Sequence, residues 1–145
     1  MGERTGGEAE ATVGVGSGAL STSLSLLGQW ALETGLGLPF TPPAEARTAF
    51  RWPFGEGAFI EVRHRAIAAA NLTARNEETT PGVSLWGIGF LIEGERIQLA
   101  LDVDNLMNAA WLDHVSAYRT LGLVTQGRWA SLRLTFDVTR EDAAH

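Results

Sequence analysis

The chain contains no cysteine and no lysine among its 145 residues. Without cysteine it has no disulfide, no thiolate metal site and no cysteine nucleophile, although this leaves the cellular compartment open. All basic side chains are Arg or His, and the net charge is −6. Because phosphate binding relies on clustered basic side chains, this balance argues against a nucleic-acid partner.

Long apolar runs are missing as well. No run of about 18 apolar residues occurs, so the sequence predicts no transmembrane helix. The sequence does not exclude a transmembrane strand, because such a strand needs only about ten alternating residues. The first seven residues lack the apolar stretch of a signal peptide. If the protein is exported, we therefore expect the start of the gene product to be absent from this sequence.

What the chain does contain is alternation of polar and apolar residues. Successive side chains of a strand point to opposite faces, so alternating stretches predict β-strands. Nearly every charge falls on one of the two faces, and on the apolar face only His64 could ionise. One further stretch, 83–92, is apolar on both faces. In all, the predicted strands cover residues 8–15, 20–33, 46–52, 60–66, 83–92, 97–104 and 130–138.

Short and long connections alternate between these stretches. The short ones are rich in glycine, and the long ones cover residues 34–45, 69–82 and 106–127. We therefore predict one all-β domain, an antiparallel up-and-down meander of about seven strands. Bacterial outer-membrane barrels have tight periplasmic turns and long external loops, so the pattern favours part of a transmembrane β-barrel. Seven strands are an odd number, whereas single-chain bacterial barrels are even.

The last third of the chain carries a more specific signal. The phrase Val-Asp-Asn-Leu-Met-Asn lies at 103–108, Trp-Leu-Asp-His-Val-Ser-Ala-Tyr-Arg at 111–119, and Gly-Arg-Trp at 127–129. Upstream, Pro-Pro at 42–43 and Asn-Glu-Glu-Thr-Thr-Pro-Gly at 76–82 each precede a predicted strand. In this order the phrases resemble the carboxyl-terminal end of TonB-dependent outer-membrane receptors. The resemblance covers roughly residues 7–138.

The resemblance implies a location and a set of partners. Residues 1–145 are expected to be a carboxyl-terminal segment of a receptor β-barrel in the bacterial outer membrane, without a plug domain. The expected partners are outer-membrane lipid, the missing plug domain and remaining barrel strands, TonB indirectly, and a small-molecule ligand. Such receptors take up a metal chelate, a siderophore or a cobalamin, and this segment is expected to be transport-incompetent alone. No cofactor is implied.

The candidate ligand contacts lie in the longest predicted external loop. Asp113 and His114 are adjacent there, with Tyr118 nearby, and these three residue types can ligate a metal or contact a chelate. A metal site needs three or four convergent ligands, so we predict no metal site. The alternative for the Asp113 and His114 pair is a hydrogen bond that stabilises the loop.

The charges of the polar face admit two interpretations. Acid–base chemistry is one, and cross-strand pairing of opposite charges is the one that we favour, because such pairing stabilises a sheet without any chemistry. No nucleophile, base and orienting acid occur at convincing spacing, so we expect no enzyme. The charges concerned are Glu61, Arg63 and Arg65 against Arg47 and Arg51, and Asp102, Asp104 and Asp137 with Arg133.

Two other readings of the alternation stay open. In the first, the chain is a soluble or small-barrel protein whose apolar face turns inwards to bind an apolar ligand. In the second, it is a truncated or misassigned reading frame that does not fold alone. An inward apolar face would favour the soluble protein, and an inward charged face would favour the membrane segment.

Overall fold

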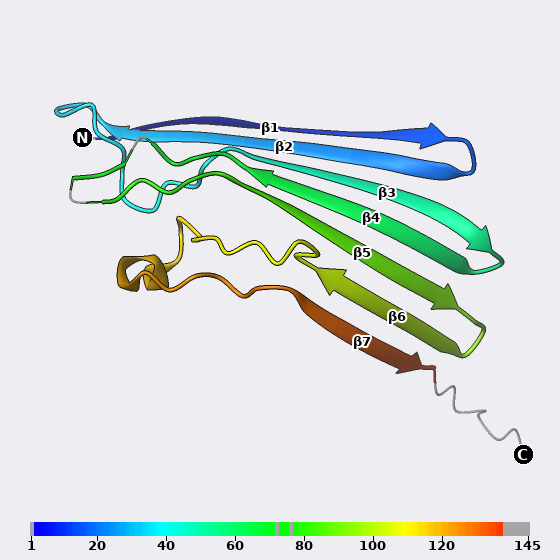
Figure 1. Cartoon of the computed structure of the whole chain (residues 1–145). Coiled ribbons are helices and arrows are strands. Elements are labelled where there is room, and N and C mark those ends of the chain that lie inside the picture. Colours follow the sequence, from blue (N-terminus) through cyan, green and yellow to red (C-terminus); the bar gives the residue numbers. More distant parts are fainter. Residues whose placement is uncertain (1, 72, 76, 138–145) are drawn as a thin grey trace, which may run out of the picture.

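The structure is a computed structural model, and it describes residues 2–71, 73–75 and 77–137. Seven antiparallel strands form one sheet in sequence order, each paired with its neighbours along the chain (Figure 1). The all-β meander predicted from the alternation is therefore confirmed. The strands are β1 (Gly2–Val15), β2 (Gly18–Ala31), β3 (Glu45–Gly55), β4 (Ala58–Ile67), β5 (Val83–Glu93), β6 (Ile97–Asp104) and β7 (Trp129–Phe136).

The largest departure from the predicted bounds is at β1, which begins at Gly2 rather than at Glu8. Its first residues do not alternate, yet they pair with β2 without a break, from Gly2 opposite Ala31 to Val15 opposite Gly18. A ladder is held by backbone groups, so it can extend beyond the patterned residues. At the other end, the predicted last strand included Val138, which lies outside the described residues.

The tight turns and the long connections lie at opposite ends of the sheet. Tight turns join β1 to β2 and β3 to β4, where Gly16 and Gly57 adopt positive φ angles of 61° and 65°. The three long connections all lie at the opposite end (Figure 1). The last of them contains a short 3₁₀ helix, η1 (Ala117–Leu121), which the sequence did not predict. No helix among the described residues is long and apolar enough to cross a membrane.

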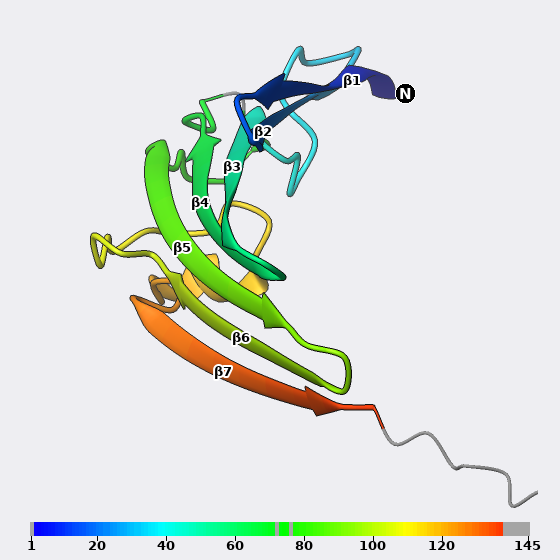
Figure 2. The same cartoon turned by 90° about the vertical axis from the view of Figure 1, so that its right-hand side faces the viewer.

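The sheet is curved (Figure 2). A cavity of about 520 Å³ is lined by Glu10 of β1, Arg47 of β3, Asp104 of β6 and Trp129 of β7. Side chains from strands so far apart can share one cavity only on the concave side. The charged face is therefore the inner face, as the membrane reading expects and the soluble reading does not.

The apolar face has no protein layer over it in the part of the chain that the structure describes. Ala70, in a loop, is the one hydrophobic residue that is buried there. Leu101, Leu132 and Leu134 are 39%, 69% and 52% exposed. Apolar side chains in continuous exposed rows mark a surface that is covered by something other than water.

Candidate functional site

An ion-pair network crosses the concave face near its centre. Arg63 of β4 donates from Nη1 to Oδ1 of Asp102 at 2.7 Å and from Nη2 to Oδ1 of Asp104 at 3.1 Å. Both carboxylates are on β6, so the guanidinium reaches over the whole width of β5. Glu61 accepts from Arg63 at 3.4 Å and lies 3.3 Å from Arg51. The predicted pairing of Glu61 with Arg51 thus occurs between adjacent strands, whereas Asp102 and Asp104 pair with Arg63, two strands away.

Two glycines of β5 make room for this reach. Gly87 and Gly89 are buried beneath the network, opposite Arg63 and Glu61 of β4. A Cβ atom on Gly89 would lie 2.8 Å from Nη1 of Arg63 and 2.8 Å from Oδ1 of Asp102, closer than such atoms approach one another. The two glycines therefore leave a gap that the guanidinium of Arg63 fills.

A second group of contacts lies closer to the outer loops. Arg65 makes two hydrogen bonds of 2.9 Å to the carboxylate of Glu45, which also pairs with Arg47. Its guanidinium carbon lies 5.5 Å from the ring centroid of Trp111, within the range of a cation–π contact. This contact places the ring of Trp111 on the inner, polar side of the sheet.

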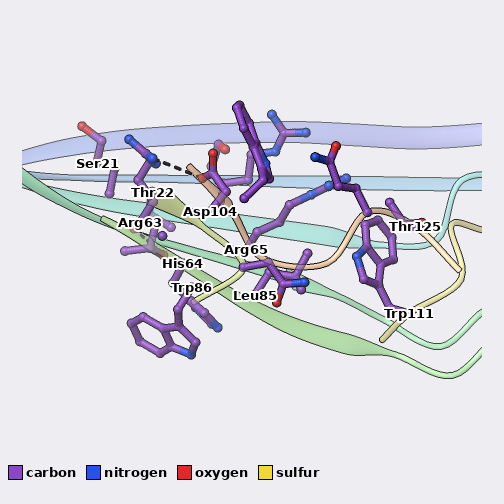
Figure 3. A pocket seen from close by; sticks show the side chains of 18 of the residues that line it. Ser21, Thr22, Arg63, His64, Arg65, Leu85, Trp86, Asp104, Trp111 and Thr125 are labelled. Atoms are coloured by element: carbon purple, nitrogen blue, oxygen red, sulfur yellow. Dashed lines mark hydrogen bonds and ion pairs between the residues drawn. The ribbon is translucent and has the colours of Figure 1, made fainter. Parts of the chain in front are cut away.

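The cavity lies between this wall and the last loop. Figure 3 shows Arg63, Asp104 and Trp111 to one side of the strands, while the ring of Trp86 points to the other. Thr125 and Gln126 complete the lining from the loop, where the backbone N–H of Thr125 donates to the carbonyl of Trp111 at 2.8 Å. The cavity therefore combines arginines, the carboxylates of Glu10 and Asp104, aromatic rings and neutral polar groups.

Trp86 instead packs on the apolar face, 40% exposed and stacked on His64 with ring centroids 4.3 Å apart. Nε2 of His64 is 2.8 Å from the hydroxyl of Ser84. His64, the one ionisable group predicted on that face, is thus paired with side chains of the same face.

The three long loops are joined by one carboxylate. Oε1 of Glu77 accepts from the backbone N–H of Phe40 at 3.1 Å and from Nη2 of Arg119 at 2.6 Å, and Oε2 accepts from the N–H of Ala74 at 2.9 Å. Arg119 also donates to the backbone carbonyl of Glu78 at 3.0 Å. We call Phe40, Ala74, Glu77, His114 and Arg119 the Glu77 cluster.

His114 has the most deeply buried side chain of this cluster, with 1% of it exposed. Its Nδ1 is 3.0 Å from the hydroxyl of Thr80, and its Nε2 lies 3.7 Å from Oε1 of Glu77. No hydrogen-bond partner within the described residues reaches Nε2. Proximity to a carboxylate favours the tautomer with the proton on Nε2, so that Thr80 donates to Nδ1.

The cluster shifts the pKa of Glu77 and that of His114. Burial alone would raise the pKa of Glu77, but the N–H groups of Ala74 and Phe40 and the charge of Arg119 outweigh it, so the pKa is lowered. Burial lowers the pKa of His114, and the charge of Arg119 lowers it further, against the opposing charges of Glu77 and Asp113. At neutral pH the cluster therefore holds a charged carboxylate and a neutral imidazole.

The structure separates the three residues that the sequence put forward as ligand contacts. His114 is buried within the Glu77 cluster, as the hydrogen-bond alternative expected. Asp113 lines a small cavity of about 80 Å³ together with His114, and its Oδ1 accepts from the N–H of Val115 at 3.1 Å. Tyr118, on η1, is 67% exposed. Among the described residues no group of three or more His, Asp or Glu could hold a metal ion.

The sequence did not single out Glu77 and Arg119, although both lie in phrases that carry the resemblance. Glu77 and Arg119 are 42 positions apart in the sequence, so no local spacing could reveal that their side chains pair. The feature that could have indicated Glu77 is composition, since it stands in an unusually polar phrase and yet the structure half-buries it.

Two asparagines in the last loop explain other parts of the same phrases. Asn105 and Asn108 adopt φ angles of 51° and 52°, a left-handed conformation that Asn tolerates better than most residues. Oδ1 of Asn108 accepts from the N–H of Arg128 at 2.9 Å, and a Cβ on Gly127 would meet that oxygen at 2.7 Å. The Asn phrase and the Gly-Arg phrase are therefore the two halves of one contact.

Comparison with known proteins gives a match at the level of structure. No protein-family model and no curated protein matches the chain. The seven-stranded meander has the fold of a wall segment from the barrel of a TonB-dependent outer-membrane receptor. The chain superposes on the solved structure of the copper transporter OprC with a TM-score of 0.86 and is 20% identical to it in sequence.

The alignment covers 94% of this chain and 24% of the OprC chain. The predicted resemblance to a receptor barrel is thereby confirmed for the fold. The matched protein is a transporter, in line with the expectation that the chain is not an enzyme.

Proposed function

We propose that this chain forms part of the wall and the outer loops of a TonB-dependent receptor in the bacterial outer membrane. The full receptor would take up a metal chelate, a siderophore or a cobalamin. In this proposal the chain is transport-incompetent alone, because the plug domain and the remaining strands are separate partners. TonB would act on the plug and so reach this chain only indirectly.

One observation carries the proposal, namely the contrast between the two faces of the sheet. The concave face holds a paired ionic network, and the convex face holds rows of exposed Leu, Val, Ile and Phe side chains. Barrel walls in the outer membrane need this arrangement, since lipid covers the outside and water fills the inside.

The ligand class is argued from the outer end of the wall. Arg65, Arg47 and Trp111 line the large cavity there, a set that suits an anionic or aromatic ligand. Of the three ligand contacts predicted from the sequence, Tyr118 has the exposure that direct contact needs. Asp113 and His114 would act by shaping the loop. OprC is described as a copper transporter, and a copper complex falls within the proposed class.

The proposal is tested by asking which tryptophan meets lipid. Two variants of the full chain each keep one tryptophan, either Trp86 or Trp111, with the other four replaced by Phe. After reconstitution into lipid vesicles, brominated acyl chains should quench Trp86 several-fold more strongly than Trp111, because quenching needs contact with the acyl chains. Equal quenching, or recovery of the chain as a compact water-soluble monomer, would contradict the proposal.

A further inference from the structure

The Glu77 cluster connects three segments that lie far apart in the sequence. Phe40 belongs to the loop after β2, Ala74 and Glu77 to the loop after β4, and His114 and Arg119 to the loop after β6. Three donors from three loops converge on one carboxylate. Arg119 also lies over the ring of Phe40, with its guanidinium carbon 5.7 Å from the ring centroid.

The backbone of Phe40 supports a clamped state. Its φ angle is 56°, in the left-handed region that a bulky side chain rarely adopts. Such a conformation persists only where surrounding contacts enforce it. The contacts that enforce it here are the hydrogen bond from its N–H to Glu77 and the contact of its ring with Arg119.

We infer that Glu77, Arg119 and His114 form an acid-sensitive latch that holds the three outer loops together as a single lid beside the concave cavity. The latch stands on contacts between loops, so it does not depend on what covers the apolar face of the sheet.

The lid reaches the cavity through the last loop. That loop supplies His114 and Arg119 to the latch and Trp111, Thr125 and Gln126 to the cavity wall. Only two residues separate Trp111 from His114 along the chain. When Arg119 leaves Glu77, the segment that carries Trp111 is tied to the loop after β4 by the contact of His114 with Thr80, and the wall of the cavity loosens on that side.

His114 is the trigger because it is neutral in the closed latch. On protonation it would stand beside Arg119, a like charge, while Glu77 at 3.7 Å and Asp113 provide opposite charge. The small cavity next to it adds Glu45 of β3 and Arg65 of β4, which are paired with each other. Burial and the cation outweigh the carboxylates, so the pKa of His114 lies below its ordinary value.

The direction of the pH effect follows from these shifts. In an open lid His114 meets water and titrates near its ordinary pKa of about 6.5, so acidification below that value favours the open lid. Glu77 acts in the same direction at lower pH, because its pKa in the closed latch is lowered and protonation removes its bond to Arg119. Each titrating group changes the closed-to-open ratio by at most about tenfold per pH unit.

Spin labels on two outer loops measure the opening directly. The chain has no cysteine, so Thr79→Cys and Leu121→Cys accept labels at two exposed positions, one in each loop. Pulsed dipolar spectroscopy of the reconstituted full chain should give one narrow distance at about pH 7.5 and a second, longer distance at about pH 5.5. Glu77→Gln should show the longer distance at both pH values.

Two further variants separate the latch from general damage. His114→Gln stays neutral at all pH values and keeps Glu77 with Arg119, so the change between about pH 7.5 and pH 5.5 should be lost. Glu78→Gln is the matched control, because its side chain is exposed and only its backbone carbonyl meets Arg119; it should behave as the parent. The inference is overturned if Glu77→Gln keeps the narrow distance at neutral pH, or if His114→Gln opens with acid as the parent does.

Discussion

At the scale of single residues, two glycines of β5 make room for the ion pairs that join β4 to β6 across the concave face. Gly87 and Gly89 leave the gap through which Arg63 meets Asp102 and Asp104. The alternation of the sequence placed Arg63, Asp102 and Asp104 on one face, but it could not show that Arg63 passes over β5. A glycine in a strand has several readings, and only the neighbouring side chains decide between them.

The first prediction concerns this gap. Gly89→Ala should lower the free energy of unfolding by about 1 to 2 kcal/mol, because its methyl group displaces the guanidinium of Arg63 and the pair is only partly shielded from solvent. The matched control is Gly14→Ala in β1, where an added Cβ meets nothing within 4 Å. Denaturant unfolding followed by tryptophan fluorescence compares them, and equal stabilities would remove the role given to Gly89.

A second prediction at this scale concerns Asn108. Replacing it by Ala removes the acceptor for Arg128 and leaves a Cβ at a φ of 52° without the polar group that makes this conformation tolerable, whereas Gly removes the acceptor without backbone strain. Asn108→Ala should therefore destabilise by about 1 to 2 kcal/mol more than Asn108→Gly. Limited proteolysis near residue 127 provides the measurement. If the two variants are cleaved at the same rate, backbone strain has no part in this contact.

At the scale of elements, strands were predictable and loops were not. Period-two alternation is a local property, so β3, β4 and β6 were found within a few residues of their observed bounds. The contacts of the Glu77 cluster join segments more than 30 residues apart, such as Phe40 and Glu77, and no local pattern encodes them. For the same reason the short helix η1, which Ser116 caps, escaped prediction.

The third prediction tests the assignment of faces on one strand. Leu101 and Ala100 are neighbours on β6 and point to opposite faces, with Leu101 39% exposed. Leu101→Arg should weaken insertion into vesicles by about 2 to 4 kcal/mol, the cost of Arg on the lipid side near the bilayer centre. Ala100→Arg adds the same charge on the inner face and should cost much less. Similar losses for both variants would argue against lipid on the apolar face.

At the scale of the whole molecule, the sheet has two open edges. The strand order runs from β1 to β7, with no pairing between these two strands in the described part of the chain. An unpaired edge offers a row of N–H and C=O groups to another strand. The fold class was therefore predictable, because alternation and loop lengths are properties of the chain itself. What covers the two edges could not be predicted, because the pairing of an edge strand depends on groups outside these residues.

The fourth prediction follows from these edges. In amide hydrogen exchange of the reconstituted chain, β3 and β4 should be protected strongly, since both of their sides are paired. Every second amide of β1 and β7 points away from the sheet and should exchange much faster. Uniform protection of β1 would mean that another strand covers this edge, as the second copy of a dimer or the rest of a barrel would do.

The gap over β5 also limits how this wall can change. A larger residue at position 89 has no room while Arg63 and Asp102 keep their present contact. Substitution at any of these three sites therefore alters which residues the other two can accept. Variants of this wall should exchange the trio as a set, and libraries that randomise the three positions jointly should yield more folded members than libraries that vary them singly.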